Sequence, residues 1–423
     1  MDRDGIYTAI LKEELVPALG CTEPIALAYA SAECRKLLGD LPEKVTAECS
    51  GNIIKNVKSV IIPNTGGMKG IEAAVAAGMI GGDASRGLEV LSAVREEDLP
   101  SIREYIAEKR VSVKLLHTSA TLHFIITMKK GNDSASVEII HQHTNIVKKI
   151  RNGEVVFQKD SSSEENMNES LTDRSVLSVD GIIEFCETAD LSLFAPIIEE
   201  QIRCNSAICE EGLRNKWGVN IGQYLLETRE KNFITEAKAT AAAGSDARMS
   251  GCVYPVVINS GSGNQGITVS VPVIVYCRRN GIEHEKLVRA LAISNLIAIH
   301  QKTRIGRLSA YCGAVNAACG AATAITWLQG GTRDQIKETI TNTLATISGM
   351  VCDGAKPSCA AKISLALEAA MMGHDLAMED DNFLPGDGIV KSDVESTIIG
   401  VGEIASKGMV STDETILNVM VND

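Results

Sequence analysis

Three cysteines in the last third of the chain carry the strongest pattern for chemistry. Cys352 and Cys359 bracket a short segment that contains Gly354 and Pro357, and Cys312 precedes them in a separate helical stretch. Because glycine and proline interrupt helices, the thiols of Cys352 and Cys359 can approach the same ligand as the thiol of Cys312. Three thiolates can hold an iron–sulfur cluster and leave one iron open as a Lewis acid. The residues alone are equally compatible with three small buried core cysteines.

The other cysteines give weaker signals. Cys21 lies in a break between two helical stretches, because Pro17 and Pro24 interrupt the apolar periodicity of residues 6–39. Irregular backbone at such a break can present a side chain. Cys319 fits either a core residue or a replacement ligand. The remaining cysteines lie in or beside apolar segments, which indicates packing: Cys34, Cys49, Cys186, Cys204, Cys209, Cys252 and Cys277.

Two glycine-rich turns have the composition of small-anion sites. Residues 260–266 show the spacing Gly-x-Gly-x-x-Gly, but the acids that a dinucleotide fold requires open a helix instead of a second strand. Ser262, Asn264 and Gln265 in this nest suit a small carboxylate, while a tight turn of purely structural importance is the alternative. Residues 64–70 join a β-like stretch to an alanine-rich helix, an arrangement that leaves backbone N–H groups at a helix start.

Other chemistries find less support. His117, His123, His141 and His143 fall on or beside neighbouring strands, but no cysteine or carboxylate stands at ligand spacing beside them, so zinc is disfavoured. Lys55 could form a Schiff base with pyridoxal phosphate, yet nothing else in the sequence supports that cofactor. The nucleophile elbow of serine hydrolases and the P-loop motif are not found.

Charge and composition exclude two large classes of function. The 423 residues include 41 basic and 54 acidic side chains, and the net charge of −13 repels nucleic acids and anionic membrane surfaces. No apolar run reaches the ~18 residues that a membrane span requires, and the first residues do not resemble a secretory signal. We therefore expect a cytoplasmic protein that binds neither nucleic acid nor membrane and keeps its twelve cysteines reduced.

The elements that position these residues predict an α+β fold in two domains. Residues 1–165 form an α+β domain that carries the Cys21 break and the Gly66-Gly67 turn, and residues 166–423 form a mainly helical domain with the glycine nest and the three cysteines. In the first domain, residues 45–62 are β-like, 71–80 are helical, and an antiparallel meander covers 111–117, 121–129 and 135–143. A polar acidic linker is expected over 160–170. Helices are expected at 181–190, 192–216, 221–243, 284–301, 304–328, 333–349, 358–372 and 391–407.

Four motifs together resemble the L-cysteine desulfidases, a family related more distantly to the iron–sulfur L-serine dehydratases. They are the Gly-Cys-Thr-Glu-Pro run at 20–24, the Asn-Thr-Gly-Gly run at 64–67, the glycine nest at 260–266, and the cysteine spacing Cys312-x39-Cys352-x6-Cys359. The resemblance extends over the whole chain.

This resemblance implies a [4Fe–4S] cluster on Cys312, Cys352 and Cys359, with Cys21 as the catalytic thiol. It also implies a lyase that makes pyruvate, ammonia and sulfide from L-cysteine. We expect the Cys21 thiolate to be the base, on the hypothesis that nearby positive charge lowers its pKa. The substrate-binding residues expected from the two turns and the cysteine loop are Thr65, Gly66, Gly67, Ser262, Asn264, Gln265 and, as a counter-charge, Lys356.

Two other functions remain compatible with the sequence. An open iron also accepts a hydroxyl, so L-serine or another β-substituted amino acid is an alternative substrate. A non-catalytic cluster protein that senses redox state is an alternative of a different class. We expect the only partners to be the small amino-acid substrate and further copies of the chain in a homo-oligomer.

Overall fold

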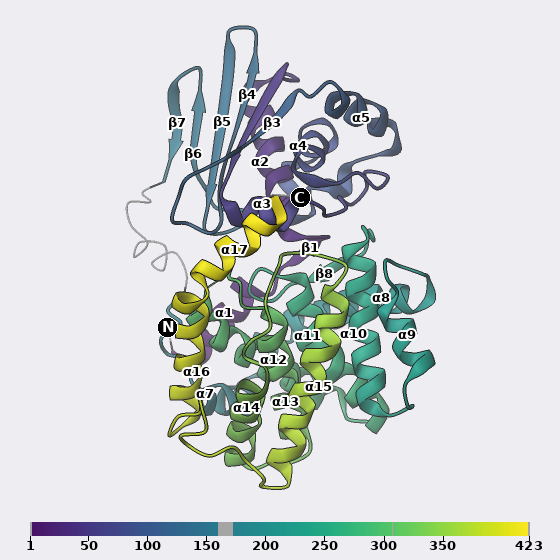
Figure 1. Ribbon diagram of the computed structural model, residues 1–423, viewed down its shortest axis with the longest axis vertical. Coiled ribbons are helices and arrows are strands. Elements are labelled where there is room, and N and C mark those ends of the chain that lie inside the picture. The colour runs from purple at the N-terminus through teal and green to yellow at the C-terminus, as the bar shows by residue number, and fades with distance from the viewer. Residues whose placement is uncertain (1, 160–171, 307, 422–423) are drawn as a thin grey trace.

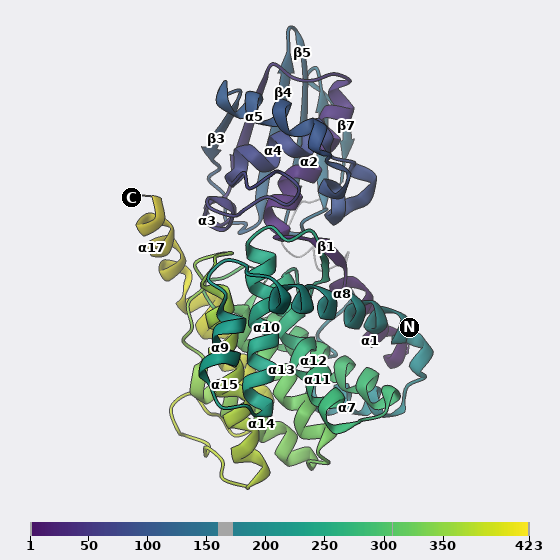
Figure 2. The ribbon, with the colours of Figure 1, turned by 90° about the vertical axis from the view of Figure 1, so that its right-hand side faces the viewer.

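The computed structural model describes residues 2–159, 172–306 and 308–421 (Figure 1). It confirms the predicted α+β class, with a sheet and its helices at one end of the molecule and a bundle of helices at the other (Figures 1 and 2). The linker expected over 160–170 lies outside the described residues. Among the described helices, none is both long enough and apolar enough to cross a membrane.

The described strands and helices have the following bounds. The strands are β1 (Pro17–Leu19), β2 (Lys44–Cys49), β3 (Val111–Leu115), β4 (His123–Lys130), β5 (Asp133–Ile140), β6 (Ile146–Arg151), β7 (Glu154–Gln158) and β8 (Pro255–Val257). The helices of the first part are α1 (Arg3–Glu14), α2 (Thr22–Leu38), α3 (Gly51–Val57), α4 (Gly70–Gly81) and α5 (Leu99–Ala107). Those that follow are α7 (Val179–Thr188), α8 (Ala195–Arg214), α9 (Ile221–Thr228), α10 (Phe233–Met249), α11 (Gly263–Asn280), α12 (His284–Ile305), α13 (Gly313–Leu328), α14 (Arg333–Ile347), α15 (Cys359–Met378), α16 (Val394–Glu403) and α17 (Val410–Val421).

The larger sheet has six strands in the order β3-β2-β4-β5-β6-β7. Along β4 the buried residues Phe124, Ile126 and Met128 alternate with more exposed ones, so one face packs on the core, where α2 covers it. The predicted meander is wrong in its first pairing, because β2 lies between β3 and β4 and pairs with β3 in parallel. Strands β6 and β7 escaped prediction because consecutive charged residues interrupt the apolar alternation of β6.

The β-like stretch predicted at 45–62 is wrong in its second half. Strand β2 ends at Cys49, and Gly51–Val57 forms the short helix α3. Ile53 and Val57 are both fully buried and lie one helical turn apart, so their apolar character suits a helix as well as a strand. Helix α3 lies beside the loop that joins Cys352 to Cys359.

The helical part follows the predicted pattern except that α11 and α17 correspond to no expected helix and two other helices are shifted. The expected helix at 221–243 is two helices, α9 and α10, and the one expected from 304 begins only at Gly313. Before Gly313, Tyr311 forms an isolated antiparallel bridge with Val351.

Two contacts join the ends of the molecule. The short strand β1 pairs antiparallel with β8, which precedes the glycine nest, and α17 returns along the bundle to lie against α3 (Figure 1). The division into domains at residue 165 stays a prediction. Both contacts place residues from the first part of the chain beside the helical bundle.

Candidate functional site

A cavity of about 100 Å³ lies where the first turns of four long helices meet. Cys21 caps α2, Ser262 caps α11, Cys312 caps α13, and Cys359 is the first residue of α15; all four line the cavity. The first turn of a helix has unpaired N–H groups and a partial positive charge. The cavity therefore favours anions, whatever the charge of the whole protein.

Basic side chains strengthen this preference. Lys55, Arg248, Lys302 and Lys362 line the cavity, and Glu23 is the one carboxylate among its described lining residues. The first three basic residues are buried. Two of these cations are paired with carboxylates outside the lining, Lys55 with Asp413 and Lys362 with Asp353, so the preference for anions rests mainly on Arg248 and the four helix starts.

Backbone pairing brings Cys312 and Cys352 side by side. The amide of Cys312 donates to the carbonyl of Met350 at 3.0 Å, and the amide of Cys352 donates to the carbonyl of Ala310 at 2.6 Å. A hydrogen bond from Cys312 lowers the pKa of the Cys352 thiol to about 6, against the effect of burial and with help from the charge of Lys55. The same hydrogen bond and burial raise the pKa of Cys312. One of the two sulfurs is thus readily available as a thiolate ligand.

Cys359 reaches the same cavity from a tight loop. The amide of Lys356 donates to its sulfur at 3.4 Å, and the thiol donates to the carbonyl of Gly354 at 3.6 Å. Gly354 has a φ of +89°, which residues other than glycine rarely adopt. The predicted turn between Cys352 and Cys359 is therefore present, and it directs both thiols into the cavity.

The donor set suits an iron–sulfur cluster better than a single ion. No group of three or more histidine, cysteine, aspartate or glutamate side chains in the described ranges could hold one metal ion. A cluster binds each thiolate through a different iron, so its ligands need not meet at a point. Cys312, Cys352 and Cys359 are free thiols in one cavity lined by cations, and they fit this requirement. Cys319 lies deeper, against Gln301, Thr323 and Thr343, and does not line the cavity.

Cys21 is hydrogen-bonded to a carboxylate. Its thiol donates to Glu23 Oε2 at 3.1 Å, and the side-chain Nδ2 of Asn56 donates to Glu23 Oε1 at 3.0 Å. Burial raises the pKa of the Cys21 thiol well above its ordinary value, and the charge of Glu23 raises it further. Burial alone would also raise the pKa of Glu23, but the charge of His143 and the bond from Cys21 lower it below its ordinary value. The expected lowering of the Cys21 pKa is therefore wrong for the chain by itself.

The glycine nest ends beside Arg248. Asn264 Oδ1 accepts a hydrogen bond from Arg248 Nη1 at 3.1 Å, while Arg248 Nε is buried with no hydrogen-bond partner among the described residues. A Cβ at Gly263 would lie 2.3 Å from this Nε, so only glycine leaves room for the guanidinium. Gln265 in turn lies against Gly313, where a Cβ would be 2.4 Å from the side-chain amide carbon. A continuous row of polar groups thus leads from Arg248 to the residue after Cys312.

The sequence-predicted residues divide into two groups. Cys21, the three cluster cysteines, Ser262, Asn264 and Gln265 all line the cavity. The turn at 65–67 is outside its lining, and the Thr65 hydroxyl donates to the carbonyl of Ile62 within the turn itself. Lys356 Nζ donates to the carbonyl of Lys55 at 3.2 Å and is also outside the lining. Substrate binding by Thr65, Gly66, Gly67 and Lys356 stays a prediction.

Several lining residues were not identified as functional from the sequence. Glu23 lay inside the recognised motif at 20–24 and could have been found there. His143 was considered only as a zinc ligand, and Lys55 only as a pyridoxal phosphate lysine, whereas both line the cavity. Arg248 carried no signal, because it ends the alanine-rich helix α10 and its neighbours in the cavity are distant in sequence.

Comparisons with known proteins show the family to which the chain belongs. A family model described as the serine dehydratase alpha chain matches residues 85–418, which include the glycine nest and the three clustered cysteines. A UPF0597 protein of Treponema denticola is 52% identical over 422 residues, covering 99% of this chain and 98% of that protein. A UPF0597 protein of Lachnoclostridium phytofermentans is 53% identical over 413 residues, covering 98% of each.

The contact between Cys21 and Glu23 predicts a change in thiol reactivity. In the iron-free protein, Glu23→Gln should make alkylation of Cys21 by iodoacetamide several-fold faster at pH 8. The substitution removes a negative charge that raises the pKa of the thiol, so the thiolate fraction increases. Mass spectrometry of the Cys21 peptide gives the rate. Glu33→Gln on the same helix is the control, because that carboxylate pairs with Lys149. An unchanged or slower rate in the Glu23 variant would show that the carboxylate does not control this thiol.

Proposed function

The chain belongs to the serine dehydratase alpha chain family, and from this premise we propose that it is a β-eliminating lyase dependent on a [4Fe–4S] cluster. Its proposed substrate is L-cysteine, which it converts to pyruvate, ammonia and sulfide. The observation that carries this proposal is one cavity lined both by three free cysteines and by the buried guanidinium of Arg248. The thiols suit a cluster, and the guanidinium suits the carboxylate of an amino acid.

The carboxylate of the substrate would bind at the row of polar groups that begins with Arg248. Arg248 lines the cavity beside Asn264, and a carboxylate oxygen would be a hydrogen-bond acceptor for its guanidinium. The N–H groups at the start of α11 and the amides of Asn264 and Gln265 add further donors. Gln265 lies against Gly313, so a substrate bound here extends toward Cys312.

Cluster ligation is assigned to Cys312, Cys352 and Cys359, whose sulfurs share the cavity. When bound, the cluster supplies an open iron that acts as a Lewis acid toward the leaving group. The cations Lys55, Lys302 and Lys362 offset the negative charge that three thiolates bring to the cavity. No fourth protein ligand is required by this assignment.

Proton removal is assigned to the pair of Cys21 and Glu23. A thiolate whose thiol has a raised pKa is a strong base once it forms. Glu23 Oε2 accepts a hydrogen bond from the Cys21 thiol at 3.1 Å and so orients the sulfur. Because the pKa of Glu23 is lowered and that of Cys21 is raised, the proton whose loss creates the thiolate would leave to solvent before the substrate binds. The thiolate would then take the Cα proton as the Cβ–S bond breaks and releases HS⁻. The aminoacrylate that remains tautomerises to an imine, and water hydrolyses it to pyruvate and ammonia.

The choice between L-cysteine and L-serine rests on two different supports. The match to the serine dehydratase alpha chain favours L-serine as the second candidate. The motif around Cys21, which the resemblance to desulfidases includes, favours L-cysteine.

Substrate choice is tested by measuring pyruvate release from L-cysteine, L-serine and their D-enantiomers with the anaerobically prepared protein. We expect the highest kcat/KM with L-cysteine, one sulfide per pyruvate, and no turnover of the D-enantiomers, because Arg248 and the thiols define one orientation of the substrate. Higher kcat/KM with L-serine would assign the chain as a dehydratase. A full cluster without turnover of either amino acid would contradict the lyase and favour a redox sensor.

The carboxylate site predicts a specific defect in binding. Arg248→Lys should raise KM for the preferred amino acid roughly 100-fold, or about 2.7 kcal/mol, because lysine cannot reproduce the planar fork of donors. The kcat should change much less, since the carboxylate does not react. Steady-state pyruvate assays measure both constants, with exposed Arg203→Lys on α8 as the control. An unchanged KM would limit Arg248 to a structural role.

A further inference from the structure

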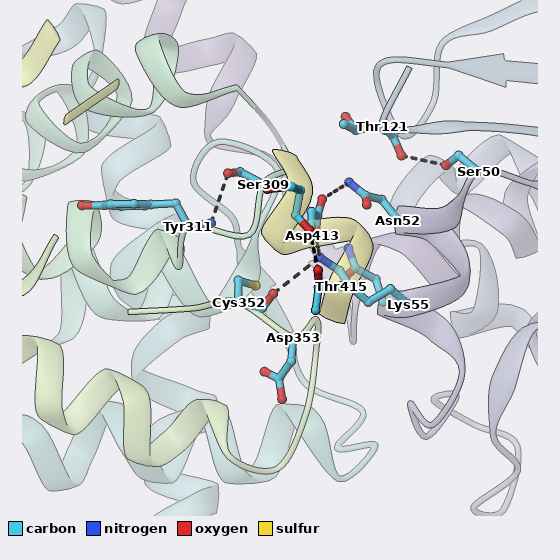
Figure 3. Close-up of polar contacts among 12 residues, drawn as sticks. Ser50, Asn52, Lys55, Thr121, Ser309, Tyr311, Cys352, Asp353, Asp413 and Thr415 are labelled. Atoms are coloured by element: carbon cyan, nitrogen blue, oxygen red, sulfur yellow. Dashed lines mark hydrogen bonds and ion pairs between the residues drawn. The ribbon is translucent and has the colours of Figure 1, made fainter. Parts of the chain in front are cut away.

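The C-terminal helix α17 makes a buried polar contact with α3 near the cysteine loop (Figure 3). Asp413 of α17 forms an ion pair with Lys55 Nζ and accepts a hydrogen bond from Asn52 Nδ2 at 2.8 Å. The side chain of Lys55 is 2% exposed and that of Asp413 is 13% exposed. Because the pair is nearly shielded from water, each charge depends strongly on its partner.

Lys55 also holds the loop that carries Cys352. Its Nζ donates to the carbonyl of Cys352 at 3.5 Å, and its own carbonyl accepts from Lys356 Nζ at 3.2 Å. Gly354, between those two residues, packs so closely on α3 that a Cβ would be 2.7 Å from Asn56 Oδ1. The loop is thus fixed to α3 through a side chain, a backbone carbonyl and a close approach of glycine.

Helix α3 also contacts the pair of Cys21 and Glu23. Asn56, the residue after Lys55, donates to Glu23 Oε1 at 3.0 Å, and Glu23 accepts the hydrogen bond of the Cys21 thiol. Helix α3 therefore sets the distance between the pair of Cys21 and Glu23 and the loop of Cys352. A shift of α3 would change both at once.

We infer that Asp413 is a positioning residue, which acts through Lys55 to hold α3 and the Cys352 loop in place. The expected effect of Asp413 on turnover rests on the proposed function. Its positioning of α3 and the Cys352 loop is a property of the iron-free chain. Asp413 does not line the cavity, so it would influence the reaction without touching the substrate. The C-terminal helix becomes part of the site's framework even though it lies outside the site.

Hydrogen–deuterium exchange of the iron-free protein tests the inference directly. Asp413→Asn keeps the shape of the side chain but removes the charge that pairs with Lys55. We expect amide exchange across residues 350–359 to become several-fold faster than in the unmodified protein. Glu414→Gln, the neighbouring residue on the same helix, is the matched control and should leave that segment unchanged. Faster exchange confined to 410–421 would overturn the inference, because α17 would then have loosened without affecting the loop.

A double-mutant cycle separates positioning from a general loss of stability. In a Lys55→Met background, Asp413→Asn should produce no further increase in exchange at 350–359, because the partner through which it acts is gone. Equal increases in both backgrounds would show that Asp413 acts by another route, and the inference would fail. The cycle also provides a folded reference if Asp413→Asn alone is unstable, since the double variant leaves no unpaired buried charge.

Turnover gives a second, separable readout. With the preferred amino acid, Asp413→Asn should lower kcat about ten-fold with little change in KM, and Asp413→Glu should restore part of the loss. A larger effect on KM than on kcat would contradict the positioning of reactive groups. If the unmodified protein turned over no amino acid, the proposed function would fail, while the exchange experiment would still decide the role of Asp413.

Discussion

The convergence of four helix starts on one cavity is the constraint on which the rest of the structure depends. Helices α2, α11, α13 and α15 each leave unpaired N–H groups there, and three of them place a cysteine at the point of entry. Such an arrangement is unfavourable unless an anion or polar group satisfies the donors. A cluster held by thiolates and an amino-acid carboxylate are both anions of suitable size.

This constraint explains why distant parts of the chain must meet. Helix α2 also packs against the six-stranded sheet, whereas the other three helices belong to the bundle. The pairing of β1 with β8 and the return of α17 to α3 connect these parts (Figures 1 and 2). The site is therefore assembled from the tertiary structure, and neither the sheet with its helices nor the bundle contains it alone.

Residues at helix breaks could be found from sequence, and residues inside regular helices could not. Cys21, Cys359 and Ser262 stood out because proline, glycine or small polar residues marked the start of a helix beside them. Arg248 lies at the end of an alanine-rich helix, so its approach to Asn264 depends on how α10 and α11 pack. The turn at 65–67 shows why glycine alone does not identify a binding site: Gly66 and Gly67 have φ values of +65° and +88°, which a tight turn needs whether or not it binds a ligand.

The fold was predictable where periodicity was strong. Strands β2, β3, β4 and β5 and most helices of the bundle, though not α11, follow from apolar spacing. The insertion of β2 between β3 and β4 is a long-range pairing that no local pattern encodes. The expected lowering of the Cys21 pKa depended on nearby positive charge, and in the chain without a cluster burial and Glu23 raise this pKa instead. The sequence shows nearby residue types, but burial and the orientation of Glu23 arise only in the folded chain.

The central claim is that Cys312, Cys352 and Cys359 hold an iron–sulfur cluster, and metal analysis tests it most directly. The protein would be purified without oxygen, and iron and acid-labile sulfide would be counted in the unmodified chain and in each single Cys→Ser variant. The claim predicts about four irons and four sulfides per chain, with loss of most iron in each of the three variants and retention in a Cys319→Ala control. An iron-free protein with full lyase activity, or unchanged iron in all three variants, would contradict it.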